Sequence, residues 1–216
     1  RMSHVSTKMG VPIGFWRSVG HSHNAFFSES FIDELAFESK QDPVAFRMSL
    51  LKNAPRYAAV LKLATDKAKW GTALPAGHAH GVALHESFGS IVAQVAEVSM
   101  QGGKPHVHRV VCAIDCGTVV NPGTVAQQVE SSVNFALTAA LFGQIDIQDG
   151  VVQQTNFTNY PLVSMAQSPL VETWIVLSTQ TPEGVGEPAV PPLAPAVANA
   201  MFKLTGKRLR SLPLAA

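Results

Sequence analysis

Two β-branched runs on either side of a glycine turn constrain the fold of this chain most strongly. Residues 89–100 alternate small apolar and polar side chains, and residues 107–114 are again rich in β-branched residues. The segment Gln101-Gly102-Gly103 between them has the turn chemistry of a hairpin. The sequence therefore predicts an antiparallel pair of strands in the middle of the chain.

Helical periodicity dominates on both sides of this pair. Apolar residues recur at helical spacing after a loop that we expect over residues 1–23. Asp42-Pro43 is a typical helix start, with a capping carboxylate and proline at the first helical position. The sequence predicts further helices over residues 56–70, 124–142 and 194–204, a short hairpin at Asp149-Gly150 and a buried strand over residues 173–177.

The order of these elements predicts an α+β fold, with helices packed on a mixed, mainly antiparallel sheet. The change of periodicity places an internal boundary in the loop over residues 71–77. We expect residues 1–72 to form a helical segment that carries a cofactor-facing loop. We expect residues 73–216 to form an α+β segment.

The low charge of the chain limits the classes of partner. Charged residues make up 14% of the 216 residues, against roughly 25% in soluble domains, so we expect another domain or subunit to cover part of the surface. The net charge is +1, without the dense cationic stripe that nucleic-acid binding needs. No run of about 20 apolar residues predicts a membrane span.

The two cysteines follow a C-x3-C spacing. Zinc and redox motifs usually have two intervening residues. We therefore expect Cys112 and Cys116 to be small apolar residues of a core strand.

A loop over residues 14–23 contains glycine, an arginine, hydroxyls and two histidines. Backbone N–H groups and Arg17 suit a phosphate-like or oxo ligand, and an arginine that ties the loop to backbone carbonyls is equally compatible. On a strand, His21 and His23 would share a face, but no third ligand has suitable spacing for zinc. A hydrolase that uses these histidines or Ser18 also lacks a coherent set of residues.

Two further segments carry polar groups in constrained settings. Gln127 and Gln128 lie early in a long apolar helix, where capping is a simpler interpretation than ligand binding. Glu187 lies in the stretch Gly184-Val185-Gly186-Glu187-Pro188, where glycine permits close approach of a ligand and Pro188 restricts the backbone. The residues alone are equally compatible with a general base and with a surface-loop glutamate.

Taken together, five segments give the chain a recognisable identity. They are GFWRSVGHSHNAFFSESFIDELA, HGVALHESFGSIVAQVAEV, VCAIDCGTVVNP, NFTNYPL and GVGEPAVPPLAPAVANA. From about residue 11 to residue 213, the chain resembles the C-terminal part of the molybdopterin-binding large subunit of the xanthine dehydrogenase and aldehyde oxidase family. It is most similar to the isoquinoline 1-oxidoreductase beta-subunit branch.

The resemblance implies an oxidoreductase that hydroxylates an aldehyde or N-heteroaromatic substrate with water as the source of oxygen. It implies that Glu187 is the base beside molybdenum and that no side chain of this chain ligates the metal. It assigns four residues to the cofactor and one to the substrate pocket: Gly186, Gln128, Arg17 and Ser18, and Val19. Val19 departs from the phenylalanine found in many relatives, and Ser131 departs from a glycine of the helix motif.

The resemblance also implies partners outside this chain. The glycine-rich pterin segments of the GQG and GGFGR types are absent, so we expect them in an upstream part of the same subunit. We expect a molybdenum–pterin cofactor, as molybdopterin or its cytosine dinucleotide, only in the complete enzyme, with a small iron–sulfur subunit as electron partner. The alternative is a non-catalytic interaction or scaffold domain derived from this family. The sequence is compatible with a cytoplasmic or a periplasmic location.

Overall fold

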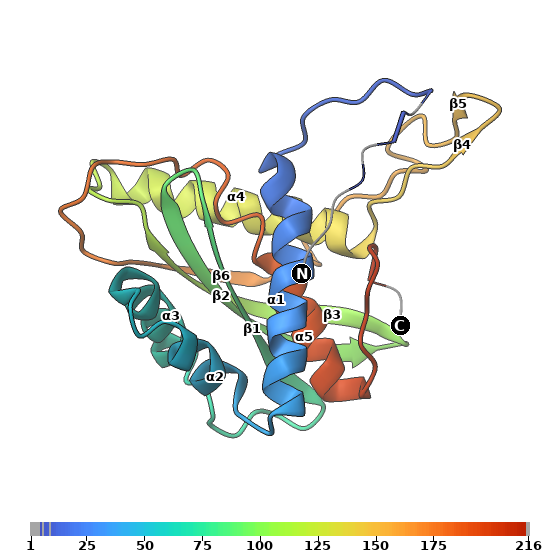
Figure 1. Cartoon of the computed structure of the whole chain (residues 1–216). Helices are drawn as coiled ribbons and strands as arrows, with labels where there is room; N and C mark the ends of the chain where they lie inside the picture. Colours follow the sequence, from blue (N-terminus) through green and yellow to red (C-terminus); the bar gives the residue numbers. More distant parts are fainter. Residues whose placement is uncertain (1–4, 6, 9, 215–216) are drawn as a thin grey trace.

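A four-stranded sheet with helices on both faces forms the fold (Figure 1). The computed structural model describes residue 5, residues 7–8 and residues 10–214. The sheet has the order β1-β2-β3-β6, built from β1 (His78–Ser87), β2 (Ser90–Gln101), β3 (Lys104–Asp115) and β6 (Leu170–Ile175). Strand β2 is antiparallel to both β1 and β3, and β6 is parallel to β3, which confirms the mixed, mainly antiparallel sheet.

Two helical layers enclose this sheet. One face carries α3 (Pro55–Lys67), with α2 (Pro43–Leu50) beside it, and the other carries α1 (Val19–Glu38), α4 (Pro122–Leu141) and α5 (Leu193–Thr205) (Figure 1). Alternate side chains of β2 divide between two cores, as strand geometry requires. Val92 and Ala96 join the core with α4 and α5, while Ile91 and Val95 join the core with α3.

Most predicted elements are confirmed, and neighbouring residues explain several of them. Asp42 caps α2, its Oδ1 accepting from the N–H groups of Val44 and Ala45 at 2.9 Å each. The short hairpin at Asp149-Gly150 joins β4 (Ile147–Gln148) and β5 (Val151–Val152). Cys112 and Cys116 are buried and unpaired, and burial raises the pKa of the Cys112 thiol to about 12.

One strand was missed in the sequence, and the start of one helix was predicted too late. Strand β1 was not anticipated, because histidines, Gly81 and a glutamate interrupt its apolar pattern. Gly81 is the place where α5 crosses β1 closely: a Cβ there would lie 2.1 Å from the Ala196 carbonyl oxygen. Helix α1 begins at Val19, whereas a loop was expected up to residue 23, so His21 and His23 lie on a helix and not on a strand.

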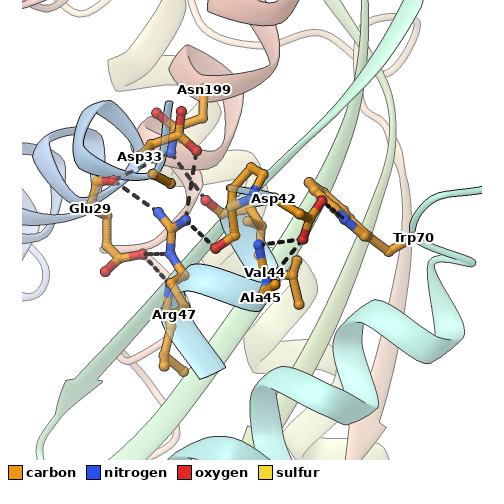
Figure 2. Close-up of polar contacts among 12 residues, drawn as sticks. Glu29, Asp33, Asp42, Val44, Ala45, Arg47, Trp70 and Asn199 are labelled. Carbon is orange, nitrogen blue, oxygen red and sulfur yellow. Dashed lines mark hydrogen bonds and ion pairs between the residues drawn. The ribbon is translucent and has the colours of Figure 1, made fainter. Parts of the chain in front are cut away.

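A buried ionic network holds α1, α2, α5 and β1 together (Figure 2). Arg47 Nε donates to Glu29 Oε2 at 2.9 Å, and the same oxygen accepts from the Leu84 N–H at 2.8 Å. Asn199 Nδ2 donates to the Val82 carbonyl at 3.1 Å. Because β1 is an edge strand of the sheet, the Glu29 carboxylate satisfies a backbone donor that has no strand partner.

None of the helices in the described part of the chain combines the length and apolar character that crossing a membrane requires.

Candidate functional site

The loop that carries Glu187 is fixed by backbone contacts to the strand ends. The N–H of Glu183 donates to the Cys116 carbonyl at 3.0 Å, and the N–H of Gly184 donates to the Phe88 carbonyl at 3.2 Å. Gly117 makes this approach possible, because it has a φ of 73° and a Cβ there would lie 1.9 Å from the Thr181 carbonyl oxygen. The sheet therefore determines where the loop passes.

Gln94 supports the loop beyond Glu187, and sequence reasoning missed it. This side chain is fully buried on β2, and its Nε2 donates to the Ala189 carbonyl at 2.7 Å. A glutamine inside an otherwise apolar, buried run of a strand was the signal, because buried amides need partners.

The Glu187 carboxylate is held at one oxygen by a distant segment. Glu187 is half-buried, and its Oε1 accepts from the Ser18 N–H at 2.9 Å. Ser18 Oγ donates in turn to the Glu187 carbonyl at 2.7 Å. Within the described residues, no hydrogen bond is found to Glu187 Oε2. One carboxylate oxygen is thus anchored, and the other is available to a reacting group.

The backbone that presents Ser18 is strained. Ser18 and Val19 have φ values of 71° and 48°, in the left-handed region that a β-branched residue rarely adopts. Such conformations cost on the order of 1–3 kcal/mol each and persist only where surrounding contacts impose them. Two hydrogen bonds between Ser18 and Glu187 hold Ser18 in this conformation.

Arg17 joins the loop of Gly186 to helix α4. Its Nε donates to the Gly186 carbonyl at 2.8 Å, and a second guanidinium nitrogen contacts the same oxygen. The guanidinium also donates to Gln128 Oε1 at 3.3 Å and to the hydroxyls of Ser131 and Ser132 at 3.1 and 2.9 Å. Burial lowers the pKa of Arg17 and the charge of Glu187 opposes that shift. Arginine nevertheless stays cationic at neutral pH.

Gln128 does not cap α4, so the capping interpretation was wrong. The cap is Asn121, whose Oδ1 accepts from the Thr124 N–H at 3.1 Å. Gln128 instead faces Gly186, where an added Cβ would lie 3.7 Å from its Oε1. Since that oxygen accepts from Arg17, the amide NH2 group of Gln128, for which the described residues supply no acceptor, remains as a donor.

The two histidines of the N-terminal loop prediction separate on α1. His21 Nδ1 lies 3.0 Å from His85 Nε2 on β1, whereas His23 is exposed and its ring lies 6.0 Å from that of Phe27. No group of three potential metal-ligating side chains occurs among the residues that the structure describes. Ser18 Oγ donates to a backbone carbonyl, which leaves the hydrolase hypothesis without a nucleophile–base pair.

The structure therefore brings together Arg17, Ser18, Gln128, Gly186 and Glu187, from segments as far as 169 residues apart in sequence. Val19 adjoins them and is 43% exposed. One cation, an amide donor, a side-chain-free position and an anchored carboxylate can bind an anionic or oxo ligand and accept a proton beside it.

Comparison with known proteins identifies the family. Residues 44–169 match the molybdopterin cofactor-binding domain family, to which the chain belongs. The chain is 32% identical over 219 residues to isoquinoline 1-oxidoreductase subunit beta of Brevundimonas diminuta, covering 99% of this chain and 28% of the relative. It is 31% identical to the membrane-bound aldehyde dehydrogenase [pyrroloquinoline-quinone] of Gluconacetobacter polyoxogenes, covering 93% and 29%.

A solved structure shares the fold. Aldehyde oxidoreductase from Desulfovibrio gigas superposes with a TM-score of 0.67 at 13% identity, over 92% of this chain and 40% of that one. The chain thus spans less than a third of the length of the two curated relatives.

Proposed function

We propose that this chain supplies the catalytic base of a molybdenum hydroxylase, with Glu187 in that role. The supporting observation is the asymmetric carboxylate: Oε1 accepts from the Ser18 N–H at 2.9 Å, and Oε2 has no hydrogen-bond partner in the described part of the chain. A base needs a fixed orientation and one accessible oxygen. The half-buried position limits competition from water.

The surrounding residues fit a molybdenum–pterin cofactor. Gly186 presents no side chain, and Gln128 retains amide donors after its oxygen is used by Arg17. Oxo and pterin groups accept hydrogen bonds, so a cationic and donor-rich lining suits them. We propose that Gly186, Gln128, Arg17 and Ser18 face the cofactor, as molybdopterin or its cytosine dinucleotide. We propose Val19 as part of the substrate pocket.

In the proposed reaction, an aldehyde or N-heteroaromatic substrate gains an oxygen atom from water and loses two electrons. The bound cofactor supplies the two-electron oxidation and activation of water. Glu187 Oε2 takes up the proton that is released, while the Ser18 N–H stabilises the carboxylate. Arg17 donates hydrogen bonds to both Gly186 and Gln128, so it holds these two residues next to each other and excludes water from between them.

The proposal assigns different parts of the site to the two segments of the chain. Residues 1–72 contribute Arg17, Ser18 and Val19, and residues 73–216 contribute the glutamine, glycine and glutamate. We propose that the upstream part of the same subunit completes the pterin site and that a small iron–sulfur subunit accepts the electrons. The share of the relatives that the chain covers supports the need for that upstream part.

The test is Glu187→Gln in the complete enzyme. We expect kcat to fall by roughly 10²–10⁴-fold, the usual effect of losing a general base, with molybdenum content unchanged by elemental analysis. Glu183→Gln is the matched control, because Glu183 is an exposed carboxylate of the same loop. Normal turnover by the Glu187 variant would exclude the base assignment. A full-length protein without molybdenum would favour the non-catalytic scaffold alternative.

A further inference from the structure

Two imidazole rings are in contact beside the Glu187 loop. His21 lies in the first turn of α1, and its Nδ1 is 3.0 Å from Nε2 of His85 on β1. Burial, together with the neighbouring His21, lowers the pKa of His85 to about 4, so His85 is neutral at physiological pH. The outer nitrogens of the pair, His21 Nε2 and His85 Nδ1, have no hydrogen-bond partner among residues 10–214.

The pair lies between the two segments that hold the candidate base. On one side, the His21 N–H donates at 2.9 Å to the carbonyl of Ser18, the residue that anchors Glu187. On the other side, the His21 ring is centred 5.4 Å from the ring of Phe88, whose carbonyl accepts from Gly184. The histidine pair therefore lies between the residue that anchors Glu187 and the turn that holds Gly184, and it takes part in neither anchoring contact.

Accessible apolar side chains adjoin this polar pair. Val19 and Phe88 are 43% and 39% exposed. Phe88 forms the two-residue turn between β1 and β2 with a φ of 53°, followed by Gly89 with a φ of 76°. A bulky residue in this backbone region is unfavourable, and the aromatic ring is nevertheless presented at the surface. A flat aromatic ligand with one polar ring atom matches this combination of surfaces.

The shared hydrogen bond lets the pair act as either donor or acceptor. If His85 Nε2–H donates to His21 Nδ1, then His21 Nε2 carries a hydrogen and is a donor. If the internal proton moves to His21 Nδ1, then His21 Nε2 releases its hydrogen to solvent and becomes an acceptor, while His85 Nδ1 takes up a proton from solvent, so the pair stays neutral. One neutral pair can therefore offer the opposite hydrogen-bonding role at the same atom.

Oxidation of an N-heteroaromatic ring beside its nitrogen reverses the hydrogen-bonding role of that nitrogen. The ring nitrogen of the substrate accepts a hydrogen bond. When the adjacent C–H carbon gains oxygen from water, the product is a lactam whose ring N–H donates. The overall change consumes one water and releases two electrons, which pass to the molybdenum–pterin cofactor, and two protons. An aldehyde has no ring nitrogen next to its reacting carbon and makes no use of the pair.

We propose that His21 and His85 are specificity-determining residues that select substrates with a ring nitrogen at the Glu187 site. This assignment rests on the proposed function of that site. It chooses N-heteroaromatic compounds over aldehydes as the preferred substrate class.

The test compares two bicyclic substrates in the complete enzyme: isoquinoline, which has a ring nitrogen, and 2-naphthaldehyde, which lacks one. In His21→Phe and His85→Phe, kcat/KM for isoquinoline falls about tenfold, the equivalent of one lost hydrogen bond, and the change is carried by KM. For 2-naphthaldehyde, kcat/KM stays within about twofold of wild type. His21→Gln, which keeps a donor and an acceptor, recovers part of the isoquinoline activity. His23→Phe, on the exposed side of α1, changes neither substrate.

Equal losses for both substrates would show that the histidines are only structural, and no loss for isoquinoline would overturn the proposal. Calorimetric binding of the product lactam, isoquinolin-1-one, provides a readout without turnover, and both phenylalanine variants should bind it about tenfold more weakly. If the wild-type enzyme contains molybdenum but Glu187→Gln retains turnover, the base assignment fails while the substrate comparison still decides the role of the histidines. Unchanged lactam affinity in both variants refutes the role independently of catalysis.

Discussion

Replacing Arg47 by methionine should strongly destabilise the packing of α1, α2 and β1. Arg47 is 2% exposed, and Glu29 and Asp33 beside it are 5% and 6% exposed. In the variant, the Glu29 carboxylate keeps only the Leu84 N–H, whereas Asp33 keeps its ion pair with Arg208 at 2.6 Å. Removing one partner of a buried ion pair costs about 3–5 kcal/mol. Because Asp33 stays paired, we expect a loss of about 3–4 kcal/mol in the free energy of unfolding.

This loss should depend on pH in a defined direction. Burial raises the pKa of Glu29 above its ordinary 4.5, and Arg47 and the Leu84 N–H oppose that shift. Without Arg47 the pKa of Glu29 rises further, so the folded state holds a proton that the unfolded state releases. Stability of the variant therefore falls as pH rises through the interval above 4.5, and the deficit relative to wild type is smaller at pH 5 than at pH 7.5.

Urea unfolding followed by circular dichroism at both pH values measures the effect. The double variant Glu29→Gln, Arg47→Met should recover to within about 1 kcal/mol of wild type, because no unpaired buried charge remains. Lys62→Met is the control: Lys62 forms an exposed pair with Asp66, so its loss should cost less than about 1 kcal/mol. A deficit below about 1 kcal/mol in Arg47→Met, or one that grows toward pH 5, would refute this account of the network.

Two further predictions concern the packing of the sheet. Gly81→Ala should lower the melting temperature by several degrees or prevent folding, because its Cβ would overlap the Ala196 carbonyl oxygen. Gly14→Ala is the control, because the space around Gly14 is open, and it should have little effect. Equal melting temperatures for the two variants would contradict the packing argument. Cys112 is buried and its pKa is raised to about 12, so it should resist alkylation by iodoacetamide at pH 8 and react only in urea. Mass spectrometry measures the labelling, and rapid labelling of the native chain would contradict the burial of Cys112.

Local sequence signals were sufficient for the elements whose causes are local. The Asp42-Pro43 helix start, the turn at Gly102-Gly103 and the glycine that ends α5 depend on neighbouring residues alone. Strand β1 could not be found in the same way. Its Gly81 and His85 are explained by α5 and α1, which pack on it from distant parts of the chain.

The candidate site shows the same division. Family motifs in the sequence drew attention to Arg17, Gln128 and Glu187, and their roles remain proposals. Their contacts arise only in the folded chain, since Arg17 and Gly186 are 169 positions apart. The contacts of Gln94 and of the His21–His85 pair could not be read from the sequence, because their partners come from distant segments of the chain.

For Glu187, the contributions of the sequence and of the tertiary structure can be separated. The sequence by itself determined that a carboxylate stands at this position and that Pro188 restricts the backbone of Glu187, while the preceding glycines leave room for close approach. Only the tertiary structure decided which carboxylate oxygen is anchored, through a hydrogen bond from a strained Ser18. That contact exists because packing against the sheet holds the start of α1 next to the loop, and no local pattern specifies such a long-range approach.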